Sequence, residues 1–563
     1  MTKIKVLITN LICIFFISHC TSNGSPTKKS YADLLNIFEN LRDIQQPQYQ
    51  NGVPDFSTDA MKQQYVFLRE LKSDLHSLDT SGWNIGNRVD YHLVKGELAA
   101  LEFHHNTLQP WSKDPGFYSF RSGDAGASMN IQRLMEPLYE FSVPLSQEQI
   151  KQFELLLNIV PNIFDQAREN LTDSSYDLAV LAIRNGKNEA EMFLNMAQDL
   201  KQDHPQLSTL AEIASNEILD FGVWLSKSMH SMKKFSGSGK EDYSWWMKNV
   251  QFSPWGWEAS NEIIQREYDR VITFLEFEEN RNKDLPALKV AMNRKEYETS
   301  LFHALNHVVE FLRDSDIMTI DDWVNPSDYS GFEDLEDLEK KLEKFSNSND
   351  EFLPENTSID TKVRQREILP GESHEYIGHM LDEQRQDRLN LSPIRKADRR
   401  FNMGSMRLEG WAVALEELLM QGGVLDDRPQ KGREMEYLMN VSHMSLAIPD
   451  MKMHANEINL EDARKLCAEI MPRGWSRPEE DMVWFEMQSN LRNPGGFHSN
   501  VVTGKAYFMK LFRERATQLG NQFTIKGFID DFLSYGIIPM PLIRWQMTGY
   551  TDEMEIHWKK KRI

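Results

Sequence analysis

The chain has 563 residues, with 63 lysines and arginines against 85 aspartates and glutamates, so its formal net charge is −22. At 40% hydrophobic and 26% charged residues, its composition excludes a disordered or fibrous protein and predicts one or two sizeable cores. Such an acidic surface repels phosphate backbones, so we do not expect nucleic acid as a partner.

The first twenty residues have the pattern of an export signal. Lys3 and Lys5 precede an apolar stretch too short to span a bilayer comfortably, and Cys20 stands where cleavage would fall. The pattern is similar to a bacterial lipoprotein signal: residues 1–19 would be removed, Cys20 lipidated, and residues 20–30 would form a flexible tether. The expected location is the outer face of a bacterial cell membrane, or the periplasmic face of the outer membrane in a Gram-negative cell. The alternative is an ordinary secretory signal with an incidental cysteine.

The cysteine count limits how the exported domain can be stabilised. The chain has three cysteines, too few for a disulfide scaffold. Signal removal would take away Cys13, and lipid would occupy Cys20, which leaves Cys467 as the single thiol. We therefore expect a large hydrophobic core to hold the domain together.

From Ser30 onward, apolar residues recur at spacings of three and four, as in Leu34, Leu35, Ile37, Phe38 and Leu41. This periodicity predicts amphipathic helices and a mainly α protein. Helix ends are expected at 82–87, 110–116, 254–256 and 326–331, where glycine and proline gather. The predicted domains are an N-terminal helical lobe (31–332), a charged connector (333–358) and a C-terminal lobe (359–563). A mobile lid over a cleft is the alternative for the connector.

Residues 371–381 contain the clearest chemical motif, His374-Glu375 followed by His379. Two neutral imidazoles can bind Zn²⁺, and an adjacent carboxylate can take a proton from water, as a zinc hydrolase requires. The histidines are five apart, however. That spacing is about 140° around a regular helix, against about 40° for the usual His-Glu-x-x-His motif.

Three arrangements of this segment are open. A π-turn accommodates one extra residue and aligns positions five apart, and Gly378 would ease that distortion. Alternatively, Glu375 and His379 hold the metal, and His374 is only a neighbour. The third possibility is a surface helix with two unrelated histidines.

The next predicted helix, 405–418, carries Glu409 and Glu416 on one face, seven residues apart. A carboxylate on a following helix is a natural third zinc ligand and leaves a fourth position open for water. The alternative is an ordinary acidic face on an amphipathic helix.

These motifs resemble those of the bacterial family called domain of unknown function 885, regarded as zinc-peptidase-like and often found in exported lipoproteins. The family carries His-Glu-x-x-Pro-Gly-His and then Glu-Gly-Trp-Ala, with a second glutamate seven after the first. The second motif corresponds here to 409–412 with Glu416, and the first to 374–379, without the proline. Further matching residues lie between 493 and 539, and the resemblance is clearest over 371–544.

The resemblance implies a large multi-helix, gluzincin-like metallopeptidase fold with two lobes around a cleft. It implies one Zn²⁺, bound by His374, His379 and Glu409. Glu375 would be the general base that activates water, and Glu416 would orient a histidine ligand.

Three further residues are weaker candidates under the same resemblance. His454 would donate a hydrogen bond to the oxyanion. Arg492 and Arg544 would bind a carboxylate of the substrate.

The missing proline leaves two alignments open. A clean deletion keeps His374 and Glu375 in their roles. An alignment fixed on Gly378-His379 instead places Ser373 at the first ligand and His374 at the base, which would make the chain a relative without turnover.

The expected function is a membrane-tethered zinc peptidase acting on peptides outside the cytoplasm. The alternative is a lipoprotein that holds a peptide or a partner without cleaving it.

Other histidines could in principle bind metal. His303 and His307 have the helical ligand spacing of four, with Glu310 nearby, but no glutamate base is adjacent. His104 and His105 are consecutive and are expected to point apart.

Overall fold

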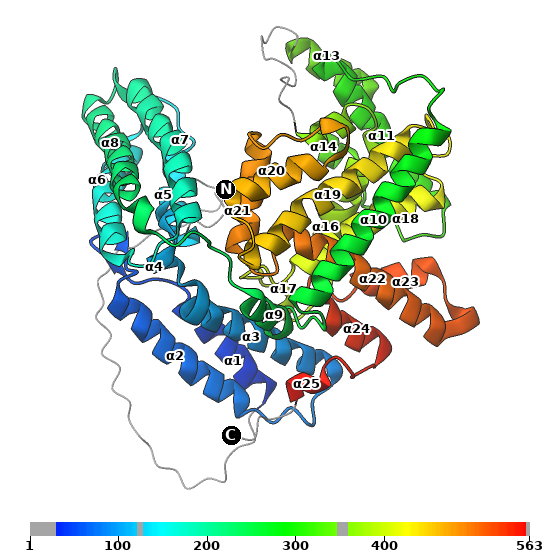
Figure 1. Cartoon of the computed structure of the whole chain (residues 1–563), viewed down its shortest axis with the longest axis horizontal. Coiled ribbons are helices and arrows are strands. Elements are labelled where there is room, and N and C mark those ends of the chain that lie inside the picture. The colour runs from blue at the N-terminus through cyan, green and yellow to red at the C-terminus, as the bar shows by residue number, and fades with distance from the viewer. Residues whose placement is uncertain (1–29, 121–127, 346–357, 559–563) are drawn as a thin grey trace.

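The computed structural model describes residues 30–120, 128–345 and 358–558, and it is almost entirely helical (Figure 1). The mainly α prediction is confirmed. The predicted signal peptide, Cys20 and the tether up to residue 29 lie outside the described residues, as do 346–357 of the predicted connector. Within the described ranges, the one sheet is a short antiparallel pair, β1 (Tyr49–Gln50) and β2 (Val53–Pro54).

Thirteen α-helices precede residue 346 in the described part of the chain. They are α1 (Tyr31–Ile44), α2 (Thr58–His76), α3 (Ile85–Phe103), α4 (Pro110–Lys113), α5 (Met129–Met135), α6 (Gln147–Asn170), α7 (Tyr176–Leu200), α8 (Pro205–Ser228), α9 (Lys240–Asn249), α10 (Trp257–Arg281), α11 (Arg294–Asp314), α12 (Ser327–Ser330) and α13 (Leu335–Phe345).

The remaining α-helices follow residue 357. They are α14 (Ile359–Arg364), α15 (Leu369–Glu372), α16 (Leu381–Arg388), α17 (Pro393–Lys396), α18 (Ser405–Gly422), α19 (Gly432–His454), α20 (Leu460–Ile470), α21 (Asp481–Arg492), α22 (Phe497–Leu519), α23 (Ile525–Leu533), α24 (Met540–Thr548) and α25 (Glu555–Trp558). Two π-helices are η1 (His104–Leu108) and η5 (Ser373–Met380), and the 3₁₀ turns are η2 (Pro115–Tyr118), η3 (Glu136–Leu138), η4 (Met229–Ser231), η6 (Pro472–Gly474) and η7 (Gly520–Gln522).

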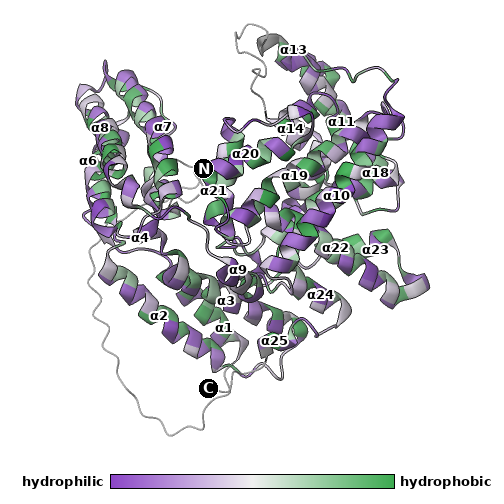
Figure 2. Ribbon diagram, viewed as in Figure 1, coloured by the Kyte–Doolittle hydropathy of each residue, from purple (hydrophilic) through white to green (hydrophobic). Residues whose placement is uncertain are grey.

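The apolar spacing in the sequence locates the buried faces of the helices. In α1, the residues at spacings of three and four, Leu34, Ile37, Phe38 and Leu41, are all buried. The expected helix end at 254–256 lies between α9 and α10. Figure 2 shows the same alternation of hydrophobic and hydrophilic residues around the helices.

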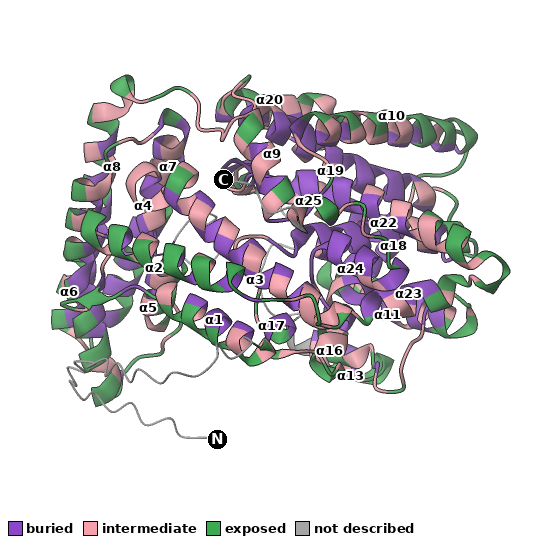
Figure 3. Cartoon of the chain, turned by 90° about the horizontal axis from the view of Figure 1, so that it is seen from below, coloured by how far each residue is buried: buried purple, intermediate pink, exposed green. Residues whose placement is uncertain are grey.

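The buried apolar residues form two large cores. The first core joins α1 and α3 to α10, α11, α18, α19, α22 and α24, and Figure 3 shows the most deeply buried segments on α18, α19, α22 and α24. The second core lies mainly within the bundle of α6, α7 and α8, which stands to one side of the molecule in Figure 1. The first core runs across residue 332, and the division into two lobes at that point stays a prediction.

The bundle of α6, α7 and α8 contacts the C-terminal helices through α7, and α6 contacts the segment around β2. Asn185 Nδ2 donates to Gln488 Oε1 of α21 at 3.1 Å, and Leu460 N donates to Asp177 Oδ2 at 3.1 Å. A small apolar cluster that includes Leu181 lies between α7 and the helices α19, α20 and α21.

Two contacts fix α18, which carries the predicted third ligand. A Cβ on Gly410 would lie only 2.4 Å from the backbone of Gly504 in α22, so the two helices cross at backbone distance. Arg407 forms a fully buried double hydrogen bond with Asp382 of α16, at 2.5 and 3.1 Å. Because α16 directly follows η5, this pair also holds η5 relative to α18.

No helix in the described ranges combines the length and the hydrophobicity needed to cross a membrane.

Candidate metal centre

The His374–His379 segment is a π-helix, η5, rather than a regular α-helix. Its backbone bonds run from residue i to i+5, so positions five apart lie on the same face. The Nε2 atoms of His374 and His379 are 2.9 Å apart, with the two rings perpendicular. The π-turn expected from the five-residue spacing is therefore present. Gly378 allows it, because a Cβ there would lie 2.7 Å from that of Ala412 in α18.

Glu409 of α18 completes a group of three possible metal ligands. Its Oε2 lies 3.5 Å from His374 Nε2 and 3.4 Å from His379 Nε2. Ligand atoms at about 2.0–2.1 Å from a tetrahedral zinc are separated by about 3.3–3.4 Å. The two distances to Glu409 match this separation and the distance between the histidines is shorter, so the donor set and its geometry fit Zn²⁺.

A fourth side chain orients the first histidine. Glu416 Oε1 lies 2.6 Å from His374 Nδ1, and the glutamate side chain is fully buried. The Nδ1–H group donates to Glu416, so Nε2, which faces Glu409 and His379, is the nitrogen that can bind a metal once its proton is displaced. Burial lowers the pKa of His374, but the bonds to Glu409 and Glu416 outweigh it and raise this pKa to about 10. The same contacts hold the pKa of Glu409 well below its usual value, although its burial acts in the opposite direction.

One protein-family model matches the part of the chain that contains the candidate metal ligands. Residues 373–547 match the family model described as "Bacterial protein of unknown function (DUF885)". The DUF885 match contains η5 and α18, and so all of the candidate metal ligands. No curated protein matches the chain significantly.

Two solved structures have the same fold over nearly the whole chain. One is described as "a putative lipoprotein of unknown function" from Shewanella oneidensis, with 17% identity and a TM-score of 0.69, covering 92% of this chain and 100% of that one. The other is a "putative lipoprotein" from Colwellia psychrerythraea, with 13% identity and a TM-score of 0.62, covering 93% of this chain and 97% of that one. At these identities the likeness is one of fold.

Glu375, the predicted base, lies in the DUF885 match next to His374 but on a different face of η5. Its side chain is 47% exposed, and its Oε1 lies 3.5 Å from Arg364 Nη2. Arg364 also forms ion pairs with Asp360 and with the buried Glu372. Glu375 is not one of the residues whose ligand atoms converge, so a base at this position stays a prediction.

Two histidines that the motifs did not indicate adjoin the centre. The ring of His443 in α19 lies parallel to those of His374 and of His498 in α22, with centroids 6.0 and 6.1 Å apart. His498 Nδ1 is 3.5 Å from Glu486 Oε2 of α21. Burial and then the charge of Glu409 raise the pKa of Glu486 to about 7, and burial lowers the pKa of His498 to about 3. Both histidines are isolated in the sequence, so no local spacing predicted them.

His454, predicted to donate to an oxyanion, is bonded within the protein at both ring nitrogens, and its catalytic role stays a prediction. The side chain is almost completely buried, and Nε2 lies 2.9 Å from Asn490 O and 3.2 Å from Asn493 O. Nδ1 lies 3.1 Å from Ser238 Oγ. Both ring nitrogens are therefore occupied in bonds between α19, α21 and the loop before α9.

Arg492 and Arg544, predicted to bind a substrate carboxylate, are occupied by carboxylates of the protein itself. Arg492 binds Asp114 through two bonds of 2.5 and 3.1 Å and donates to Gln488 at 3.0 Å. Arg544 is buried and binds Glu514 and Asp552, each at 2.7 Å. Both guanidinium groups form ion pairs within the protein, and their role in binding a substrate stays a prediction.

The competing histidine pairs do not form a metal site in the described part of the chain. His307 Nε2 bonds to Val424 O at 3.0 Å. His105 Nε2 lies 2.8 Å from Gln64 Oε1, and the ring of His104 packs against Phe401.

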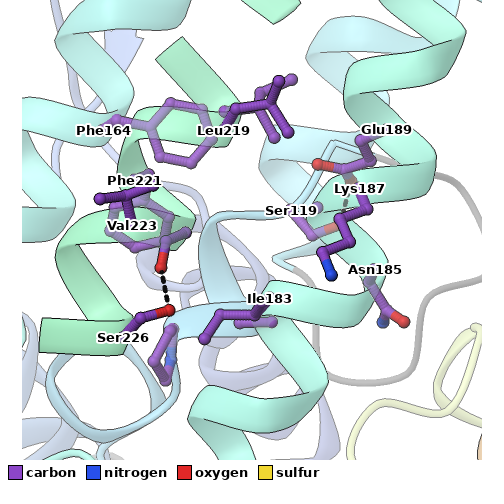
Figure 4. Close-up of a pocket in the computed structure, with 16 residues that line it drawn as sticks. Ser119, Phe164, Ile183, Asn185, Lys187, Glu189, Leu219, Phe221, Val223 and Ser226 are labelled. Atoms are coloured by element: carbon purple, nitrogen blue, oxygen red, sulfur yellow. Dashed lines mark hydrogen bonds between the residues drawn. The ribbon is translucent and has the colours of Figure 1, made fainter. Parts of the chain in front are cut away.

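A cavity of about 250 Å³ lies within the bundle of α6, α7 and α8 (Figure 4). Phe164, Leu219 and Phe221 form its apolar side, opposite Ser119 and Glu189. Ser119 Oγ and Phe120 N both donate to Glu189, so this carboxylate has a structural role. No predicted site residue lines this cavity.

Proposed function

We propose that the protein is a zinc-dependent peptidase that acts outside the cytoplasm while anchored to the membrane by a lipid on Cys20. The observation that carries the proposal is the convergence of His374 Nε2, His379 Nε2 and Glu409 Oε2 within 3.5 Å of one another, with Glu416 behind His374. The choice of a peptide as substrate rests on the resemblance of these motifs to DUF885.

The residues of the centre divide into ligands and proton carriers. His374, His379 and Glu409 would hold the metal, and bound Zn²⁺ supplies a Lewis acid that polarises a carbonyl and activates water. Glu416 accepts a hydrogen bond from Nδ1–H of His374, so that Nε2 is the nitrogen that binds the metal once its own proton is displaced. The exposed carboxylate of Glu375, oriented by Arg364, accepts the proton of the attacking water and passes it to the leaving amine.

The membrane anchor has its own support. Residues 1–20 have the order of a lipoprotein signal, and the two structural neighbours are described as putative lipoproteins. Mass spectrometry of the membrane fraction tests it: a lipid-modified N-terminus at Cys20 is expected, and Cys20→Ser should release the protein from the membrane.

Metal analysis and a cleavage assay together test the enzymatic proposal. We expect about one zinc per chain in the wild type, loss of zinc in His374→Ala, and loss of cleavage of a mixed peptide library with a chelator. Glu375→Gln should keep its zinc and lose cleavage. Glu383→Gln, an exposed carboxylate on the adjacent helix α16, is the matched control and should behave as the wild type.

The outcomes separate the two candidate functions. A protein without zinc, or a Glu375→Gln variant that cleaves normally, would contradict the proposed mechanism. Peptide binding without turnover, equal in the wild type and in Glu375→Gln, would instead support the non-catalytic lipoprotein.

A further inference from the structure

A second cavity, larger than the one in the α6–α8 bundle, lies away from the candidate metal centre. It has a volume of about 710 Å³, within the ~300–1,000 Å³ typical of small-molecule sites. Its walls come from the end of α1, the segment from η1 to η2, the loops on either side of the α6–α8 bundle, residues 400–402, and the end of α21. None of the candidate metal ligands is among its described lining residues.

Two cations in this cavity, Arg400 and Lys113, form no close ion pair with a carboxylate of the described residues. Arg400 Nη1 donates to the sulfur of Met129, and Lys113 Nζ donates to Thr107 O, each at 2.8 Å. Within the described ranges, no carboxylate lies within 4.0 Å of either cation, whereas Arg492 and Lys233 in the same cavity are paired with Asp114 and Asp173. Burial and then repulsion by Arg42 and Arg133 lower the pKa of Arg400, and these effects outweigh the opposite influence of Asp398 and Glu97. The Arg400 side of the cavity is therefore positive in a protein whose net charge is −22.

Donors without acceptors lie on the same wall. Gln45 Nε2, Arg400 Nε and Asn402 Nδ2 are buried and have no hydrogen-bond acceptor in the described part of the chain. Arg42 connects the two segments that carry them: it donates to Gln45 Oε1 at 3.0 Å and to Asp398 O at 3.1 Å. Buried donors are usually paired, so these three, which share one wall, are available to an acceptor supplied by a ligand.

The backbone of this wall adopts a costly conformation. Phe401 and Asn402 are consecutive non-glycine residues in the left-handed region, with φ of 61° and 56°. Gln251 Nε2 donates to Asn402 O at 2.6 Å, and the Phe401 ring packs against His104 at 4.7 Å. Backbone strain of this kind is found mainly at binding and catalytic sites, where it positions side chains.

We propose that this cavity binds an organic carboxylate, with the acid group at Arg400 and Asn402 and the apolar part against Trp111, Phe117 and Phe401. A carboxylate supplies the negative charge and the acceptors that this wall lacks, and Arg binds it through two parallel bonds. The acid is either a free small molecule or the C-terminus of a peptide, and the two sources share the same recognition. The site does not depend on the metal centre.

Calorimetric titration of the full-length protein tests the proposal with matched pairs of probes. The pairs are indole-3-acetate with its amide, octanoate with its amide, and a Phe-Phe dipeptide with its C-terminal amide. Inorganic phosphate is titrated as a bare anion. We expect at least one acid to bind at one site per chain and its neutral partner to bind at least tenfold more weakly. Arg400→Gln should weaken the acid at least tenfold.

Two control variants test whether binding depends on this cavity, and not on surface charge or on the metal centre. Arg513→Gln, an exposed cation outside the cavity, should leave binding unchanged. Binding should also persist in His374→Ala, so that failure of the zinc proposal leaves this one standing. If no acid binds, if acid and amide bind equally, if phosphate alone binds as well as the acids, or if Arg400→Gln has no effect, the proposal is overturned.

Discussion

At Gly378, the geometry of the metal centre depends on the absence of one methyl group. A Cβ at this position would lie 2.7 Å from Ala412 Cβ and 3.0 Å from its Cα. Non-bonded carbon atoms pack at about 3.5–4.0 Å, so Gly378→Ala has to move η5 away from α18 by about 1 Å. Trp411 Nε1 donates to Gly378 O at 3.1 Å across the same contact between the helices. The shift would lengthen this hydrogen bond as well.

The expected effect follows from which helix carries which ligand. His374 and His379 are both on η5, while Glu409 and Glu416 are on α18. A shift of about 1 Å lengthens the 3.4 and 3.5 Å distances from the histidines to Glu409 beyond 4 Å, too far for ligands that each lie about 2.1 Å from one zinc. We expect zinc affinity to fall at least tenfold. The overpacked contact should also lower the free energy of unfolding by about 1–3 kcal/mol.

Competition with a chromogenic chelator measures the zinc affinity, and urea unfolding measures stability. Gly222→Ala is the matched control, because no atom lies within 4 Å of a Cβ at that position in α8. It should leave zinc affinity unchanged and stabilise the protein by about 1 kcal/mol, since alanine favours a helix over glycine. A folded Gly378→Ala protein with wild-type zinc affinity would refute the argument that this contact sets the ligand geometry.

Two further substitutions test buried carboxylates, one at the metal centre and one in α7. Glu416→Gln should weaken zinc binding about 10–100-fold, because it removes the carboxylate that orients His374, and an unchanged affinity in the chelator competition would exclude that role. Burial raises the pKa of Asp177 from 3.8 to about 6, so the folded state holds a proton that the unfolded state has lost, and the free energy of unfolding falls as the pH rises through this interval. Asp177→Asn keeps an acceptor for Leu460 N and should raise the free energy of unfolding at pH 7 by about 1–3 kcal/mol; a variant with the wild-type pH dependence in urea unfolding would contradict this.

The sequence predicted those parts of the site that are set locally. Apolar periodicity located the buried face of α1, because a helix face depends on residues three and four apart. The five-residue spacing of His374 and His379 made a π-turn one of three open arrangements, because the geometry of such a turn is decided locally, and the structure has the π-turn. Glu409 and Glu416 were placed on one face of one helix, and that face lies against η5.

Partners that are distant in the sequence could not be predicted in this way. A lone arginine gives no sign of which carboxylate will lie opposite it, and Arg492 is bound by Asp114, 378 positions away. His443 and His498 reach the centre only because α22 packs against α18 and α19 packs against α22. The packing of whole helices decides which carboxylate a guanidinium group meets, so the sequence did not show the ion pairs of Arg492 and Arg544.

The π-turn and the third ligand are physically coupled, which explains how a five-residue spacing can serve a metal centre here. A π-helix is less favourable than an α-helix and needs compensating contacts. Those contacts come from Trp411, which bonds to Gly378 O, and from Ala412, which packs on Gly378 Cα. Both residues lie between Glu409 and Glu416 on α18, so one stretch of helix stabilises the distortion of η5 and supplies the carboxylates that face it. A change that relaxes η5 to an α-helix would separate the two histidines. Glu409 of α18 would then no longer lie close to both of them.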